Sequence, residues 1–260
     1  MDEIKIIEEI KRKLEEIEEK ENVTILFAVE SGSRAWGFAS PDSDFDVRFV
    51  YKRNDINDYL KLEGIRDVIE WELNDIYDIN GWDLDKTLKL VHGSNPVIFE
   101  WADSPIVYKE TPFYEEFRQF IKPYFMTIKG AHHYLHMAER NYEMYLNDEK
   151  VKLKKYFYVL RPILALKYVL HNRTNPPMLF EKLVEAELDN DAVKREVERL
   201  LDAKKNTPEL GIARRIPVLN DYIQKELVLM KNEVDSLNKE QTDWDELNAF
   251  FIKTLFNAKN

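Results

Sequence analysis

Apolar positions along the first 80 residues predict one helix followed by several strands. Residues 2–21 have the period of an amphipathic helix, with apolar side chains three or four positions apart at Ile4, Ile7, Ile10, Leu14 and Ile17. Residues 23–30 form a short apolar, β-branched run, and residues 44–51 alternate apolar with polar positions, so both predict strands. Residues 67–73 and 75–81 are weaker strand candidates.

The pattern after residue 80 is helical. Residues 83–93, "DLDKTLKLVHG", begin with an aspartate and end with a glycine, which are typical helix start and stop signals. Five longer helical segments follow, at about 112–122, 125–147, 151–171, 179–205 and 218–257. We therefore predict an α+β protein with a small mixed β-sheet domain at residues 1–110 and an all-helical domain at residues 111–260.

Residues 32–46, "GSRAWGFASPDSDFD", contain two of the seven glycines in the chain together with three aspartates. Gly32 directly follows a predicted strand, where glycine allows unusual backbone angles and a close approach of a ligand to the main chain. Ser33 offers a hydroxyl, and the backbone N–H groups around it suit phosphate oxygens. Arg34 is a candidate phosphate contact, with a surface ion pair as the alternative. The turn is thus a candidate phosphate cradle.

Asp44 and Asp46 are two positions apart on a predicted strand, so both carboxylates should project from the same face. Two such charges repel each other unless a cation binds between them. Oxygen-only ligands favour Mg²⁺ or Mn²⁺. A turn is the alternative explanation for the "PDSD" run, but a phosphate cradle next to a metal-holding pair is the arrangement used to transfer a nucleotide.

The stretch "GSRAWGFASPDSDFDV" closely resembles the signature of the DNA polymerase beta-like nucleotidyltransferase superfamily. The blocks "DINGWDLDKTLKLVHGSNPVIFEW" and "KKYFYVLRPILALKYV" are similar to those of its RNA-ligase-associated branch of predicted nucleotidyltransferases. The resemblance covers most of residues 28–170. It implies a third metal-binding carboxylate that also helps deprotonate the acceptor hydroxyl. Asp78 matches the family order, and Glu72 is the alternative.

A basic segment interrupts this otherwise acidic chain. Between Glu149 and Glu181 there are seven Lys and Arg residues and no acidic residue, although the net charge of the chain is −11. Lys154, Lys155 and Arg161 could neutralise the phosphates of a nucleotide or of RNA. The alternative is a solvated helix face, with Arg161, which interrupts an apolar run, paired internally.

The composition narrows the possible functions. The absence of cysteine excludes a disulfide framework, a thiolate nucleophile and a zinc–sulfur site. No phosphate loop of the G-x-x-x-x-G-K-[ST] type occurs, and the net charge argues against broad coating of nucleic acid. The charged amphipathic start and the lack of a long apolar run predict a cytoplasmic protein that does not bind membranes.

We therefore expect a Mg²⁺- or Mn²⁺-dependent nucleotidyltransferase that transfers a nucleoside monophosphate from an NTP, with ATP favoured, and releases pyrophosphate. The resemblance favours an RNA end as acceptor, consistent with RNA repair. Transfer of AMP to a protein or a small molecule, as in antitoxin or aminoglycoside enzymes, is the first alternative. A nucleotide-binding sensor without activity is the second.

Overall fold

The computed structural model describes residues 3–206 and 211–256, which divide into two compact units. Among the described residues, the first unit comprises 3–35, 44–124 and 242–256. The second comprises residues 36–43 and 125–241. The α+β class is as predicted, with the sheet in the first unit. The sequence prediction divides the chain once, into domains at 1–110 and 111–260. In the structure, residues 112–124 and 245–256 belong to the same compact unit as the sheet.

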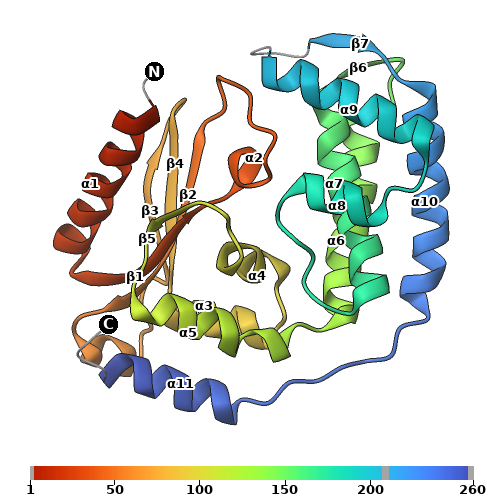
Figure 1. Ribbon diagram of the computed structural model, residues 1–260. Helices are drawn as coiled ribbons and strands as arrows, with labels where there is room; N and C mark the ends of the chain where they lie inside the picture. The colour runs from red at the N-terminus through yellow and green to blue at the C-terminus, as the bar shows by residue number, and fades with distance from the viewer. Residues whose placement is uncertain (1–2, 207–210, 257–260) are drawn as a thin grey trace. The chain divides into compact units, whose positions relative to one another are not determined.

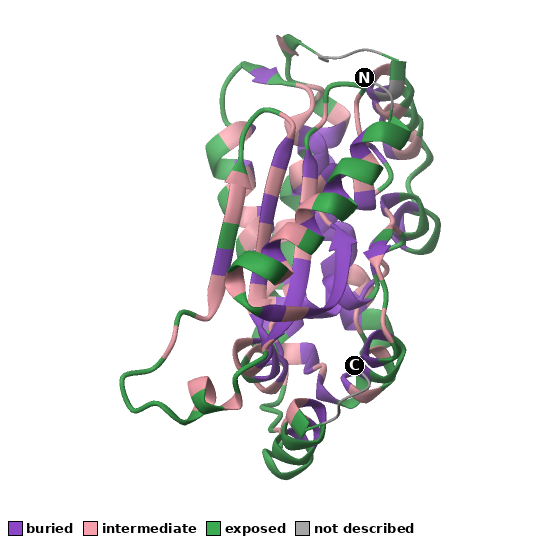
Figure 2. Cartoon of the chain, turned by 90° about the vertical axis from the view of Figure 1, so that its left-hand side faces the viewer, coloured by how far each residue is buried: buried purple, intermediate pink, exposed green. Residues whose placement is uncertain are grey.

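A five-stranded mixed sheet forms the centre of the first unit, in the order β3-β4-β2-β1-β5. The strands are β1 (Val23–Glu30), β2 (Phe45–Arg53), β3 (Val68–Leu73), β4 (Tyr77–Asp83) and β5 (Val107–Lys109). All pairings are antiparallel except β2 with β4, which run parallel. The inner strands β1 and β2 are largely buried, whereas the edge strand β3 is more exposed (Figure 2).

Helix α1 (Glu3–Glu21) packs on one face of this sheet (Figure 1). Its buried side chains are those of Ile6, Ile10, Leu14 and Ile17, so the apolar stripe starts at Ile6 rather than at the exposed Ile4. They share a core with Val47, Phe49 and Ile79 of the sheet. Asp46 and Asp78 alternate with these strand residues and so belong to the opposite face.

Helices also cover the other side of the sheet. The helical segments of this unit are α2 (Gly32–Ala35), η1 (Ile56–Leu60), α3 (Leu84–His92), α4 (Pro96–Ala102), α5 (Pro112–Phe120), η2 (Lys122–Tyr124) and α11 (Asp245–Phe256). Phe27 of β1 packs against Phe113, Tyr114 and Phe117 of α5. Asp83 caps α3 by accepting the backbone N–H of Asp85 at 2.9 Å, as the sequence predicts.

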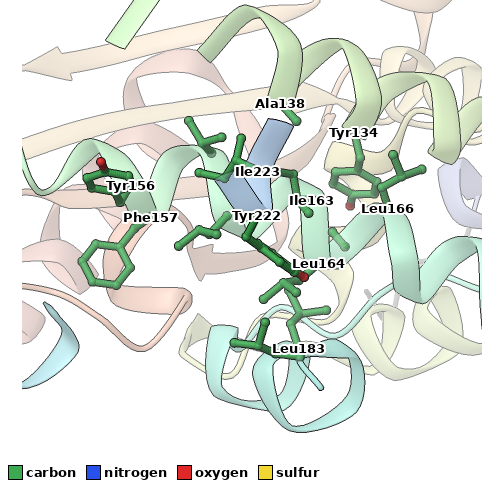
Figure 3. Packing of buried hydrophobic residues seen from close by; sticks show 14 of the residues in the cluster. Tyr134, Ala138, Tyr156, Phe157, Ile163, Leu164, Leu166, Leu183, Tyr222 and Ile223 are labelled. Carbon is green, nitrogen blue, oxygen red and sulfur yellow. The ribbon is translucent and has the colours of Figure 1, made fainter. Parts of the chain in front are cut away.

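The second unit is a helical bundle around α7 (Lys155–Asn172). Its other elements are α6 (Thr127–Tyr145), β6 (Lys150–Lys152), α8 (Phe180–Glu187), α9 (Asp191–Asn206), β7 (Ile212–Arg214) and α10 (Pro217–Asp235). Figure 3 shows Ile163 and Leu164 of α7 in one cluster with Tyr134 of α6, Leu183 of α8 and Ile223 of α10. Burial of α7 on nearly all sides explains its uniformly apolar centre.

Three predicted helical segments differ from the observed ones. Residues 150–152 pair as a strand with residues 212–214, so α7 begins only at Lys155. The segment 179–205 is broken because the Asn190 side chain accepts the N–H groups of Ala192 and Val193 and starts a new helix. The segment 218–257 is two helices, α10 and α11, which belong to different units.

The sequence pattern predicted only helices after residue 80 and did not predict strand β5. It has only three residues, and its pairing partner β1 lies about 80 positions earlier in the sequence, so no local pattern marks it. Along residues 3–206 and 211–256, no helix combines the length and apolar character required to cross a bilayer.

Candidate active site

The parallel pairing of β2 with β4 brings two of the predicted carboxylates together. Asp46 is the direct register partner of Asp78, between the pairs Phe45–Tyr77 and Val47–Ile79. Both aspartates are half-buried, on the sheet face opposite α1. Asp44 lies one residue before β2 and is exposed. Burial raises the pKa of Asp46, and the charges of Asp44 and Asp78 raise it further, against the opposing effect of Arg48.

Arg48 links the two half-buried aspartates. Its Nη2 lies 2.9 Å from Oδ1 of Asp46 and 2.7 Å from Oδ2 of Asp78, and its Nη1 donates to the carbonyl oxygen of Asp78 at 2.6 Å. The guanidinium therefore holds both carboxylates by charge-assisted hydrogen bonds. The sequence interpretation missed Arg48, although the alternation of β2 places position 48 on the same face as position 46.

The glycine–serine turn packs directly on Asp46. Gly32 has a φ of +58°, and a Cβ atom at this position would lie 1.8 Å from Oδ2 of Asp46. The N–H of Ser31 also donates to the Asp46 carbonyl oxygen at 2.8 Å. Ser33 is buried in the short helix α2. Gly32 therefore provides both the left-handed backbone conformation and the room for the carboxylate.

Arg34 lies on the same turn and fixes the approach to β2. Its guanidinium stacks on the ring of Phe45 at 3.7 Å, and its Nε donates to the backbone oxygen of Asp44 at 3.0 Å. Its Nη1 also lies 3.3 Å from the exposed carboxylate of Glu3. The surface ion pair considered as an alternative is thus present, and contact with a phosphate remains a prediction.

Glu72, the alternative third carboxylate, has a different partner. Its Oε2 lies 2.5 Å from Nζ of Lys13 on α1, and its Oε1 accepts from the Asn74 side chain. In this structure Asp78, rather than Glu72, is therefore next to Asp46. The catalytic role of Asp78 stays a prediction.

The basic residues Lys154, Lys155 and Arg161 belong to the helical unit. Lys155 lies over the rings of Tyr145 and Tyr158, at 3.9 and 4.6 Å. Arg161 is 2 % exposed and lies 4.4 Å from the ring centre of Trp36. Binding of a phosphate would require the Arg161 guanidinium to become exposed. Lys154 is at the N-cap position of α7.

Glu30 is a buried acid that the sequence interpretation did not single out. It ends the apolar strand β1 and is fully buried. Its carboxylate accepts the N–H of Asp46 at 2.8 Å and the hydroxyl of Tyr108. Burial outweighs these hydrogen bonds and raises the pKa of Glu30 to about 7. The sequence does contain a signal for this residue, because Glu30 is a charged residue at the end of the apolar run that forms β1.

The raised pKa of Glu30 predicts a pH-dependent stability. Above pH 4.5 the unfolded chain has lost this proton, whereas the folded chain keeps it up to about pH 7. Stability should therefore fall as the pH rises through this window, by up to about 1.4 kcal/mol per pH unit. Glu30→Gln should remove that part of the slope, measured by urea unfolding between pH 5 and 8.

The pH dependence of stability differs most clearly between the wild type and Glu30→Gln above pH 6. Burial also raises the pKa of Asp83, to about 6, so this residue contributes in both proteins at lower pH. Equal slopes for the wild type and Glu30→Gln between pH 6 and 7 would contradict the assignment to Glu30.

The ligand atoms that the carboxylates of the site offer are of the kind that binds a divalent cation. Asp44, Asp46 and Asp78 supply only oxygen atoms, which Mg²⁺ and Mn²⁺ prefer. A cation here would offset the charges of Asp44 and Asp78, which add to burial in raising the pKa of Asp46. As the side chains stand, no cluster of three or more His, Asp or Glu residues converges on one point in the described part of the chain. Asp46 and Asp78 converge on Arg48 instead.

Comparison with known proteins identifies the family. Residues 6–253 match the model of the family described as RlaP, the RNA repair pathway DNA polymerase beta family. The chain is also 42% identical over 253 residues to the uncharacterized protein YcgL of Bacillus subtilis (strain 168), covering 96% of this chain and 95% of that protein. The chain thus belongs to the RNA repair pathway DNA polymerase beta family, and this membership indicates a nucleotidyltransferase linked to RNA repair.

Proposed function

We propose that this protein transfers a nucleoside monophosphate from an NTP, with ATP favoured, to the hydroxyl group at an RNA end. The observation that carries the proposal is the pairing of Asp46 with Asp78 on adjacent strands, next to the Gly32 turn. Family membership supports the reaction class and the link to RNA repair. A divalent cation, which polymerase beta-like nucleotidyltransferases generally use, would neutralise phosphate charge and acidify the acceptor hydroxyl when bound.

The chain's own residues have the following roles in this proposal. Asp44, Asp46 and Asp78 would hold the cation, and the backbone N–H groups around Gly32 and Ser33 would bind the terminal phosphates. Asp78 takes the proton of the acceptor hydroxyl. The acceptor oxygen then bonds to the α-phosphorus, the bond from this phosphorus to the bridging oxygen breaks, and pyrophosphate leaves with the bonding electrons. Lys154 and Lys155 are proposed to bind the phosphates of nucleotide or RNA.

A second candidate is the transfer of AMP to a protein or a small molecule. A cavity of about 220 Å³ adjoins Asp78, and its other lining residues include Glu70, Glu72 and Asn80. None of its seven lining residues is Lys or Arg. Such a lining suits a neutral or cationic acceptor better than one that brings several phosphates, which is the observation favouring this candidate.

A labelling experiment separates the two candidates. Incubation with α-labelled ATP, Mg²⁺ or Mn²⁺ and fractionated cell extract should place label in RNA, and γ-labelled ATP should place none there. Treatment with ribonuclease or protease identifies the acceptor. The Asp44→Asn/Asp46→Asn double variant should label nothing. Label in protein or in a small molecule would favour the second candidate, and transfer unchanged in the double variant would exclude this site.

A further inference from the structure

The guanidinium of Arg48 is held from several sides. Besides the two carboxylates, its Nη1 donates to the backbone oxygens of Asp78 and Val47, at 2.6 and 3.1 Å. The Arg48 side chain is 13% exposed. Both its charge and its planar fork are therefore used at the site.

Arg48 holds oxygen atoms of the same two carboxylates that would hold a divalent cation. Nη2 contacts Oδ1 of Asp46 and Oδ2 of Asp78, one oxygen of each carboxylate. A metal ion and a guanidinium carry charge of the same sign and would compete for these oxygens. A cation held by Asp46 and Asp78 would therefore compete with Arg48 for them.

We propose that Arg48 is a built-in counter-ion that competes with the divalent cation for Asp46 and Asp78. This inference rests on the proposed function. In the free protein Arg48 offsets part of the charge of the two carboxylates and keeps them paired, so the cation alone binds weakly. The phosphates of an NTP add ligands that strengthen cation binding, so cation and nucleotide displace Arg48 together. Arg48 is thus a positioning residue that couples loading of the cation to loading of the nucleotide.

The affinity of the protein for Mn²⁺ in the absence of nucleotide tests this coupling. Electron paramagnetic resonance, which detects the free Mn²⁺, measures that affinity. Arg48→Met should raise the Mn²⁺ affinity at least about tenfold, the lower end of the effect of a neighbouring cation on the proton affinity of a carboxylate. Arg48→Lys, which keeps the charge but loses the fork, should give an intermediate value. Addition of a non-hydrolysable NTP should narrow the difference between wild type and Arg48→Met.

Arg53→Met is the matched control. Arg53 lies on the same strand, its side chain is also 13% exposed, and it faces a carboxylate of its own, with Nε 3.7 Å from Oδ2 of Asp83. Its replacement should leave the Mn²⁺ affinity unchanged. Thermal unfolding provides a second readout, because added Mn²⁺ should raise the Tm of Arg48→Met more than that of the wild type.

The possible outcomes distinguish this inference from the proposed function. Unchanged or weaker Mn²⁺ binding by folded Arg48→Met, or by Arg48→Lys if the former does not fold, would show that Arg48 only organises the carboxylates and would overturn the inference. If Asp46→Asn binds Mn²⁺ as well as the wild type does, the cation site itself is wrong and the proposed function fails with it.

Discussion

Replacing Asp46 with asparagine is expected to lower kcat for nucleotidyl transfer by at least about 10³-fold. The change removes the charge that we propose binds the cation but keeps an oxygen that can accept from Arg48. It should not weaken the fold, because burial and the neighbouring acids already raise the pKa of Asp46 and so disfavour its ionised form. We expect an unchanged or higher Tm together with the loss of activity.

Asp75→Asn is the control for this variant. Asp75 is an exposed residue in the turn between β3 and β4, on the same unit as Asp46. Its replacement should leave both kcat and Tm close to the wild-type values. Wild-type turnover by Asp46→Asn would show that the Asp46 carboxylate is not needed for the reaction. Loss of activity through unfolding, seen as a lower Tm, would contradict the stability prediction.

Replacing Gly32 with alanine is expected to lower kcat/KM by at least about 10²-fold, the usual effect of displacing a catalytic group by about 1 Å. The new Cβ would lie 1.8 Å from Oδ2 of Asp46, so the carboxylate or the turn must move. The residue also has a φ of +58°, which strains alanine by about 1–2 kcal/mol. Steady-state kinetics and urea unfolding measure the two effects separately.

Gly64→Ala separates backbone strain from the clash. Gly64 has a similar φ of +71°, but a Cβ there would meet nothing within 4 Å. Both variants should lose comparable stability from the backbone conformation, and only Gly32→Ala should lose activity. Equal activity in the two variants would mean that contact between Gly32 and Asp46 does not matter for the reaction.

The sequence predicted the parts of the site that depend on local pattern. The run from Val23 to Glu30, the turn at Gly32 and the alternation after Asp44 were sufficient to place a strand, a turn and a strand, and the structure contains all three. The proximity of Asp78 to Asp46 was expected only from family order. It results from the parallel pairing of β2 with β4, whose register depends on contacts between distant segments.

Other features could not be predicted because they depend on packing between distant segments. Phe250 of α11 stacks on Phe120, which places the C-terminal helix with the sheet unit. Phe38, from the loop between the glycine turn and Asp44, is fully buried in the core of the helical unit. Neither partner is indicated by periodicity, which shows that a face is apolar without showing what covers it.

The central claim is that Asp46 and Asp78 form, next to the Gly32 turn, the cation site of a nucleotidyltransferase. A crystal structure with Mn²⁺ and an ATP analogue that resists cleavage between the α- and β-phosphates tests it most directly. The account predicts an anomalous Mn²⁺ peak about 2.1 Å from an Asp46 oxygen, with the guanidinium of Arg48 moved away. A peak elsewhere, with the bridge from Asp46 through Arg48 to Asp78 intact beside bound nucleotide, would contradict it.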